Sequence, residues 1–332
     1  QCIAKVTEPQ QVAIAEYLKN AEIKVECLDS TRLLDIEITG YSENHVAKIH
    51  IANHHTNLVG MEKDGQAVLE LAISDSAEEN LTDKSLLNVA TILEFASTVD
   101  VELLRPMIQR QIDCNLAIAW EGLRGEWGAN VGQILLRDFG DDTKIAAKAF
   151  AAAGSDARMS GCELPVVIVS GSGNQGMTAS LPVIVYAQRM GCTEEQLFRA
   201  LAVSDLITIH QKSGIGRLSA YCGAISAGCG AGAGIAYLCD GSFQAIAHTV
   251  VNALAILSGT ICDGAKPSCA AKIASAVEAG IMGYRMYCND REFKRGEGIV
   301  GSSVDETIAN VGVLAKVGMK KTDRVILQIM TQ

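Results

Sequence analysis

The stretch "RLSAYCGAISAGCGAGAGIAYL", Arg217 to Leu238, predicts a helix built almost wholly from small side chains. Gly228 and Gly232 lie four residues apart, as do Gly230 and Gly234, which places each pair on one helical face. Glycine faces let helix backbones approach closely, so we favour this over the nucleotide-binding loop that "GCGAGAG" also resembles. The chain has 31 glycines and 48% hydrophobic but only 5% aromatic residues. We expect tightly packed helices.

The helical period extends over residues 81–332, with Gly, Asp or Pro between the helical segments. This pattern predicts one large all-helical domain. The candidate helices are 85–97, 106–123, 130–140, 143–154, 193–211, 217–238, 243–259, 269–287 and 304–318.

Residues 1–80 follow a different pattern and predict a small α+β domain. "TEPQQVAIAEYLKN", Thr7 to Asn20, begins with a capping Thr and an early Pro, which favours a helix. Apolar and polar residues then alternate over 23–27, 34–38 and 47–51, and "MEKDGQAV" is typical of a hairpin turn. The fold class we expect is α+β: an antiparallel sheet region followed by a helical domain.

Charge and composition exclude several classes of protein. The net charge is −10 with no dense block of Lys or Arg, so we expect no nucleic-acid partner. The longest apolar stretch, Phe243 to Cys262, contains Gln244, His248 and Asn252, so we interpret it as a buried helix rather than a membrane span. Eleven cysteines without a recognisable export signal point to a reducing compartment. We expect a cytoplasmic location.

A glycine loop lies in "LPVVIVSGSGNQGMTAS", Leu164 to Ser180, which predicts a strand, a turn and a helix start. Its glycines spell the G-x-G-x-x-G of dinucleotide sites, but no alternating βαβ pattern surrounds it, and Glu194 and Glu195 belong to a helix start. We therefore expect no NAD. A plain turn is one alternative. We favour a small-anion site at the helix N-terminus, made by Ser170, Gly171, Ser172, Gly173, Asn174, Gln175 and Gly176.

Two cysteines frame "CDGAKPSC", Cys262 to Cys269, a loop that can wrap a metal. Cys269 opens the next predicted helix, whose dipole would lower the pKa of its thiol. A third thiol would come from Cys222 or Cys229.

Three thiolates would leave one iron of an iron–sulfur cluster open to act as a Lewis acid. Beside an anion loop, such an iron suggests β-elimination from an amino acid. A non-catalytic iron–sulfur or redox-sensing protein is the alternative.

Five motifs together resemble the L-cysteine desulfidase family, which is related to the α-chain of iron–sulfur L-serine dehydratases. They are "AAAGSDARMSG", "SGSGNQGMTASLPV", "RLSAYCGAISAGCGAGAG", "ICDGAKPSCAAK" and "GEGIVG", and the similarity runs from His55 to the C-terminus. The resemblance implies a lyase with a 4Fe-4S cluster that cleaves L-cysteine to pyruvate, ammonia and sulfide without pyridoxal phosphate. L-Serine dehydratase activity is the main alternative.

The resemblance also implies site residues. The cluster ligands fall on Cys222, Cys262 and Cys269, and the loop from Ser170 to Gly176 matches the substrate-carboxylate region. Arg158 and His210 match further substrate positions. Arg158 could instead pair with Asp156 or Glu163, and His210 could be a core residue.

The N-terminus departs from the family pattern. Relatives carry a "GCTEP" motif whose cysteine is thought to be a base or a ligand, whereas this chain has "KVTEPQ", with Val6 at that place. We expect the family's N-terminal segment to be missing, so the general base is unassigned and an inactive fragment is a further alternative. We expect a homodimer that acts on a small amino acid.

Overall fold

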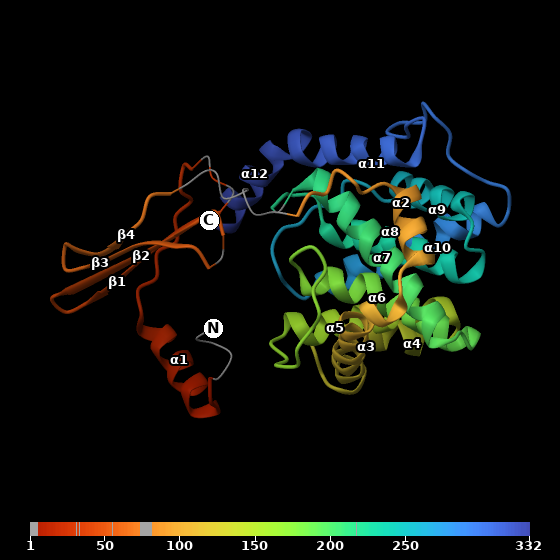
Figure 1. Ribbon diagram of the computed structural model, residues 1–332. Coiled ribbons are helices and arrows are strands. Elements are labelled where there is room, and N and C mark those ends of the chain that lie inside the picture. Colours follow the sequence, from red (N-terminus) through yellow and green to blue (C-terminus); the bar gives the residue numbers. More distant parts are fainter. Residues whose placement is uncertain (1–5, 31, 33, 55, 74–81, 217) are drawn as a thin grey trace. The chain divides into compact units, whose positions relative to one another are not determined.

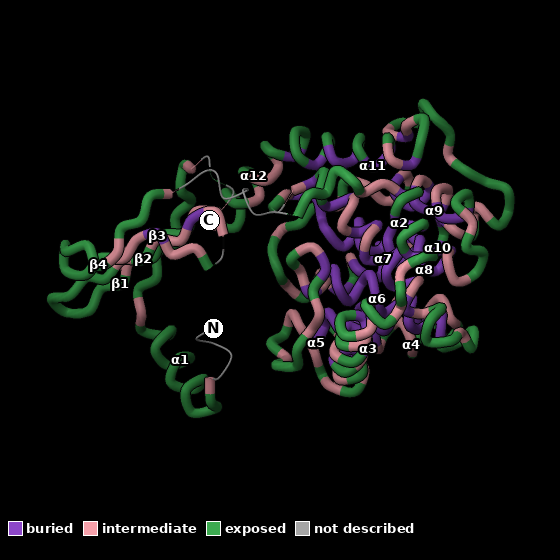
Figure 2. The backbone as a smooth tube through the Cα atoms, viewed as in Figure 1, coloured by how far each residue is buried: buried purple, intermediate pink, exposed green. Residues whose placement is uncertain are grey.

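The computed structural model describes residues 6–30, 32, 34–54, 56–73, 82–216 and 218–332 (Figure 1). The chain divides into two compact units, residues 1–83 with 325–332, and residues 84–324. Their interiors differ: buried residues are concentrated in the helical unit, whereas the strands and first helix of the small unit are mostly exposed (Figure 2). The predicted domain boundary after residue 80 lies within 74–81, outside the described residues.

The small unit contains one helix and a four-stranded antiparallel meander, which confirms the α+β prediction. Helix α1, Glu8–Asn20, begins at Thr7, whose backbone N–H donates to Gln10 Oε1 at 2.9 Å. The strands β1 (Asp35–Ser42), β2 (His45–Ala52), β3 (Leu58–Lys63) and β4 (Gln66–Glu70) pair in sequence order. Asp64 and Gly65 have φ angles of 51° and 78°, as the predicted β3–β4 hairpin turn requires.

One predicted strand in this unit does not form. Residues 21–30 are not in a strand, and Ile23 and Val25 are 62% and 65% exposed. Alternation alone is insufficient, because a strand also needs a neighbour for its backbone hydrogen bonds.

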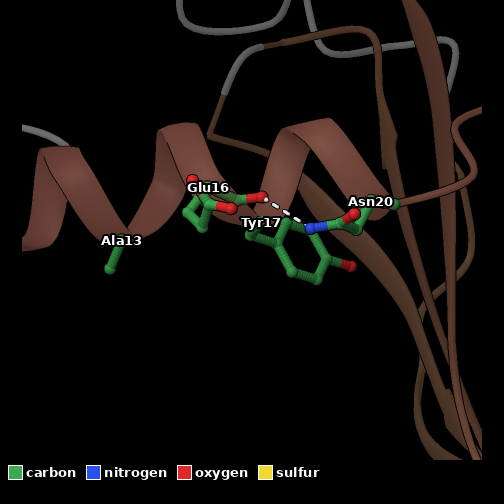
Figure 3. A pocket seen from close by; sticks show the side chains of 5 residues that line it. Ala13, Glu16, Tyr17 and Asn20 are labelled. Atoms are coloured by element: carbon green, nitrogen blue, oxygen red, sulfur yellow. Dashed lines mark hydrogen bonds between the residues drawn. The ribbon is translucent and has the colours of Figure 1, made fainter.

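A shallow hollow along α1 is lined by Ala13, Glu16, Tyr17, Asn20 and Ala21. Figure 3 shows that Ala13, Glu16, Tyr17 and Asn20 come from one stretch of α1. Within it, Asn20 Nδ2 donates to the Glu16 carbonyl at 3.3 Å. Its carboxylate, Glu16, is exposed and forms an ion pair with Lys19. Because these groups stay in solvent, we do not take the hollow as a candidate active site.

The large unit is helical throughout, as predicted, and no helix within the described residues is both long and apolar enough to cross a membrane. Its helices are α2 (Val89–Thr98), α3 (Val101–Arg124), α4 (Val131–Phe139), α5 (Thr143–Met159), α6 (Gly173–Met190), α7 (Glu194–Ile215), α8 (Gly223–Cys239), α9 (Phe243–Ile256), α10 (Cys269–Tyr287), α11 (Val304–Val313), the π-helical turn η1 (Leu314–Gly318) and α12 (Lys320–Met330), whose last part belongs to the small unit.

The glycine face of α8 packs on α10, as the small residues predict. A Cβ built on Gly228 would lie 2.4 Å from the Ala276 backbone, and one built on Gly232 would lie 2.6 Å from the Gly280 carbonyl oxygen. A step of four residues along α8 therefore matches a step of four along α10, so the two helices run parallel.

Helix α6 runs parallel to α8 as well. The Gln175 side chain lies against Gly223, and Val183 lies against Gly234, further along both helices. The helices α6, α8 and α10 have 18, 17 and 19 residues, which corresponds to roughly 27 Å each. Because they are parallel and nearly equal in length, their N-termini meet at one end of the bundle and their C-termini at the other.

The predicted strand before α6 does not form. Residues 163–168 are not in a strand, and the segment is held by Asn115 of α3. Asn115 Oδ1 accepts from the Val167 N–H at 2.9 Å, and Asn115 Nδ2 donates to the Val167 carbonyl at 3.5 Å. A single side-chain amide thus takes the place of a neighbouring strand.

Candidate functional site

The N-terminal ends of α6, α8 and α10 bring most of the predicted site residues together. Helix α6 begins at Gly173 in the glycine loop, α8 begins directly after Cys222, and α10 begins at Cys269. Helix N-termini present free N–H groups and partial positive charge, which favour bound anions and thiolates. We call this region the N-terminal end of the bundle.

Cys222 and Cys262 are held side by side by a short backbone pairing. Cys222 N–H donates to the Thr260 carbonyl at 3.0 Å, Cys262 N–H donates to the Ala220 carbonyl at 2.6 Å, and Tyr221 pairs with Ile261 between them. The two thiols form a hydrogen bond. That bond, together with burial, raises the pKa of the Cys222 thiol.

The neighbouring Cys262 behaves in the opposite way. The hydrogen bond from Cys222, the amide of Gly264 and the charge of Lys272 lower the pKa of the Cys262 thiol to about 6. Cys262 is also the more exposed of the two residues. The two shifts favour a proton on the buried Cys222 sulfur and a thiolate at Cys262.

The third thiol and a lysine complete this group. Cys269 Sγ lies 3.7 Å from the Gly264 carbonyl oxygen, within the same loop. Lys272, one turn into α10, donates to the Ile261 carbonyl at 3.0 Å and forms an ion pair with Asp263. The charge of Lys272 acts on all three thiols.

The alternative third thiol, Cys229, lies elsewhere. It is in the interior of α8, only 2% exposed, and its sulfur lies 3.7 Å from the Val250 carbonyl of α9. Cys222 precedes α8 instead of lying within it, which is why it can reach the Cys262 loop.

Arg158 of α5 connects the glycine loop with the thiols. Its Nη1 donates to Asn174 Oδ1 at 3.2 Å, and its charge interacts with Cys269. A Cβ on Gly173 would lie 2.5 Å from Arg158 Nε, so glycine leaves room for the guanidinium. Asp156, one of the alternative partners, instead accepts from the Gly132 N–H at the start of α4, at 3.1 Å.

The glycine loop itself is a tight turn. Ser170 and Gly171 have φ angles of 49° and 84°, and Ser172 N–H donates to the Val169 carbonyl at 3.2 Å. The Ser172 side chain does not cap α6. The N–H groups of the first turn of α6 have no helical acceptor, so they are available to an anion.

The side chain of His210 contacts α11. Its Nε2 lies 2.9 Å from Asp305 Oδ1, so it joins α7 to α11. Lys212 is two residues further along α7, about 200° around the helix. His210 and Lys212 therefore face different neighbours, and the role of His210 in substrate binding stays a prediction.

Lys212 is a candidate site residue that sequence reasoning missed. It is 7% exposed, and no hydrogen bond or ion pair engages its ammonium group within the described residues. Burial lowers the pKa of Lys212, while the charges of Cys262 and Cys222 act in the opposite direction. Those two thiols are therefore its electrostatic neighbours. In sequence, "HQKSG" resembles an exposed helix end, and the only available signal was its position one helical turn before the glycine that ends α7.

Within the described residues, no three His, Cys, Asp or Glu side chains are placed to share a single metal ion. The N-terminal end can instead supply thiolates to a larger group and positive charge to an anion. Its cations are Arg158, Lys212 and Lys272, and its thiols are Cys222, Cys262 and Cys269.

Comparison with known proteins supports the family resemblance that the sequence motifs indicate. A family model described as the serine dehydratase alpha chain matches residues 9–328. A UPF0597 protein from Desulfitobacterium hafniense is 54% identical over 330 residues, which cover 99% of this chain and 77% of the relative. A UPF0597 protein from Lachnoclostridium phytofermentans is 48% identical over 330 residues, covering 99% and 79%. The chain therefore belongs to the serine dehydratase alpha-chain family.

Proposed function

We propose that the chain catalyses β-elimination from L-cysteine, giving pyruvate, ammonia and sulfide, with a 4Fe-4S cluster as its cofactor. The observation that carries this proposal is the meeting of three thiols with the anion-binding start of α6 at one end of the bundle. The reaction needs both, because the substrate carboxylate has to be held beside the group that assists the leaving sulfur.

The donor set fits such a cluster. Iron–sulfur clusters are held by cysteine thiolates, and Cys222, Cys262 and Cys269 are thiols beside the cation Lys272. Each thiolate of a 4Fe-4S cluster binds a different iron, so the sulfurs do not need the convergent geometry of a single-ion site. When bound, a cluster with three protein ligands supplies one open iron as a Lewis acid toward the leaving group.

The glycine loop and Arg158 would hold the substrate carboxylate. The free N–H groups at the start of α6 favour an anion, and Arg158 adds a guanidinium that Asn174 holds at 3.2 Å. This contact fixes the α-carbon relative to the thiols and leaves the β-substituent free to face them.

Lys212 is the group we propose to accept the Cα proton, at Nζ. Arg158 cannot act as a base because guanidinium stays protonated, and the charge of Lys272 is held by Asp263. Burial of Lys212 lowers its pKa and so increases the fraction of neutral amine at neutral pH. A desolvated lysine of this kind is a suitable general base.

L-Serine is the second candidate substrate, favoured by the description of the family model. The same residues would hold its carboxylate and remove its Cα proton, with a hydroxyl instead of a thiol as the leaving group. We further propose that the protein works in the cytoplasm, because a cluster with an open iron needs a reducing compartment. We also propose that it is a homodimer.

The experiment is a pyruvate assay with anaerobically reconstituted protein, comparing kcat/KM for L-cysteine and L-serine. We expect turnover with a preference for L-cysteine, and loss of turnover in Cys262→Ala. Cys288→Ala is the matched control, because Cys288 is an exposed thiol at the opposite end of α10. Equal activity in Cys262→Ala and wild type would overturn the proposal, and a preference for L-serine would select the second candidate.

A further inference from the structure

Gln175 carries a buried polar atom that nothing in the described part of the protein satisfies. It is the third residue of α6, 9% exposed, and its Oε1 has no hydrogen-bond partner. A buried carbonyl without a partner loses its hydration and gains nothing in return. An unpaired buried polar group calls for an explanation, and a bound ion, water or ligand at that place is one that supplies the missing hydrogen bond.

The amide of Gln175 lies beside the thiols. A Cβ built on Gly223 would lie 2.2 Å from Gln175 Nε2 and 2.6 Å from Cδ, so the amide rests directly on the Gly223 backbone. Gly223 is the residue after Cys222 and the first residue of α8. The unpartnered oxygen is therefore at the N-terminal end, between the start of α6 and the first thiol.

The chemistry of the neighbouring groups indicates which ligand atom fits this oxygen. Arg158, Lys272 and the first N–H groups of α6 are donors or cations, which suit a carboxylate. The Gln175 carbonyl is an acceptor and would repel a carboxylate oxygen. An α-ammonium group is a charged donor attached one bond from the carboxylate-bearing carbon.

We propose that Gln175 Oε1 binds the α-ammonium group of the substrate and thereby selects α-amino acids over their des-amino analogues. This inference rests on the proposed function and adds a residue that determines which class of carboxylate compound is accepted. The loop and Arg158 hold the carboxylate, while Gln175 Oε1 accepts a hydrogen bond from the α-ammonium group.

The test is equilibrium binding of L-cysteine and of 3-mercaptopropanoate, which lacks the amino group, to cluster-loaded protein carrying Lys212→Met. This reference protein is wild type at Gln175 and lacks the proposed base, so L-cysteine binds without being consumed. Gln175→Met should weaken L-cysteine binding about 10- to 100-fold, the usual effect of losing a hydrogen bond to a charged group, and leave 3-mercaptopropanoate within about twofold. Gln175→Glu should bind L-cysteine at least as tightly as the reference protein, because a carboxylate attracts an ammonium group more strongly than an amide does.

Two results would overturn the assignment. The first is that Gln175→Glu weakens L-cysteine as much as Gln175→Met does, which would mean that the amide faces the carboxylate. The second is that the reference protein binds the two compounds equally, or binds neither. Binding is measured without turnover, so selective binding by the reference protein without pyruvate formation by the wild type would contradict the proposed function while supporting this assignment.

A second variant guards against a folding defect in Gln175→Met. Gly223→Ala adds a methyl group that the end of the Gln175 side chain can avoid by moving, so the backbone is kept while the amide is displaced. We expect Gly223→Ala to weaken L-cysteine selectively as well, with the cluster absorbance unchanged. Equal weakening of both compounds by Gly223→Ala would count against the proposal.

Discussion

The two ends of the α6, α8 and α10 bundle carry the same kind of residue in opposite surroundings. At the N-terminal end are Cys222, Cys262 and Cys269. At the C-terminal end, Cys239 closes α8 and Cys288 follows α10. There the Cys239 sulfur lies 3.8 Å from the Met190 sulfur, and the Tyr284 hydroxyl forms hydrogen bonds with both Cys239 and Cys288.

The exposed thiols Cys262, at the N-terminal end, and Cys239, at the C-terminal end, differ in ionisation. Hydrogen bonding and a nearby cation lower the pKa of Cys262 to about 6, whereas burial raises the pKa of Cys239 above its ordinary value. Helix dipoles act in the same sense, since N-termini stabilise thiolates and C-termini favour cations over anions. The position of a cysteine in the bundle, more than its spacing in sequence, therefore sets which groups surround its thiol.

The largest effect we predict is on catalysis at the N-terminal end. Lys212→Met should lower kcat by about 100- to 10,000-fold, as expected for loss of a general base, with the cluster absorbance unchanged. Lys212→Arg should be nearly as poor, because guanidinium stays protonated. In the wild type, activity should rise with pH as Lys212 loses its proton. The exposed Lys316→Met is the control, and unchanged kcat in Lys212→Met would remove this residue from the reaction.

The next prediction concerns the close packing of α8 on α10, which aligns the ends of these two helices. Gly232→Val should lower the free energy of unfolding by about 1–3 kcal/mol or more, because its Cβ would lie 2.6 Å from the Gly280 carbonyl oxygen. Gly40→Ala is the control, since no atom lies within 4 Å of the added carbon. Urea unfolding measures both. Similar stability in the two variants would mean that α8 does not pack closely on α10.

Thiol reactivity should distinguish the two ends directly. In cluster-free protein at pH 7, roughly nine-tenths of Cys262 is thiolate if its pKa is about 6, while Cys239 stays mainly protonated. Iodoacetamide should therefore modify Cys262 at least about tenfold faster, measured by peptide mass spectrometry. The difference should shrink toward pH 5, as Cys262 gains its proton. Both residues are exposed, so equal rates at pH 7 would show that their ionisation does not differ.

The smallest effect belongs to His210, which faces Asp305 instead of the thiols. His210→Gln should lower the free energy of unfolding by about 1 kcal/mol through the weakened contact with Asp305. It should leave kcat/KM within about twofold. A tenfold rise in KM with unchanged stability would restore His210 to substrate binding.

Much of this arrangement could be predicted from local patterns. The helical segments, the Asp64–Gly65 hairpin and the opening of α10 at Cys269 follow from periodicity and turn chemistry. The prediction of a strand before α6 was wrong, because the side chain of Asn115 holds Val167 in place of a neighbouring strand. No local pattern indicates such a substitution.

The candidate site likewise contains residues that local sequence patterns indicate and residues that they do not. The cysteines and the glycine loop stand out in sequence because their residue types and spacing are unusual. Lys212 and the unpartnered oxygen of Gln175 do not, since each depends on burial that only the packed helices create.

The most direct test of the account is anaerobic reconstitution with iron and sulfide, followed by the brown iron–sulfur absorbance. It compares wild type with serine substitutions at each end of the bundle: Cys222→Ser, Cys262→Ser and Cys269→Ser against Cys239→Ser and Cys288→Ser. We predict that wild type and both C-terminal variants take up a cluster, while each N-terminal variant loses it. Equal uptake by all five variants, or none by the wild type, would contradict the assignment of the cluster to the N-terminal end.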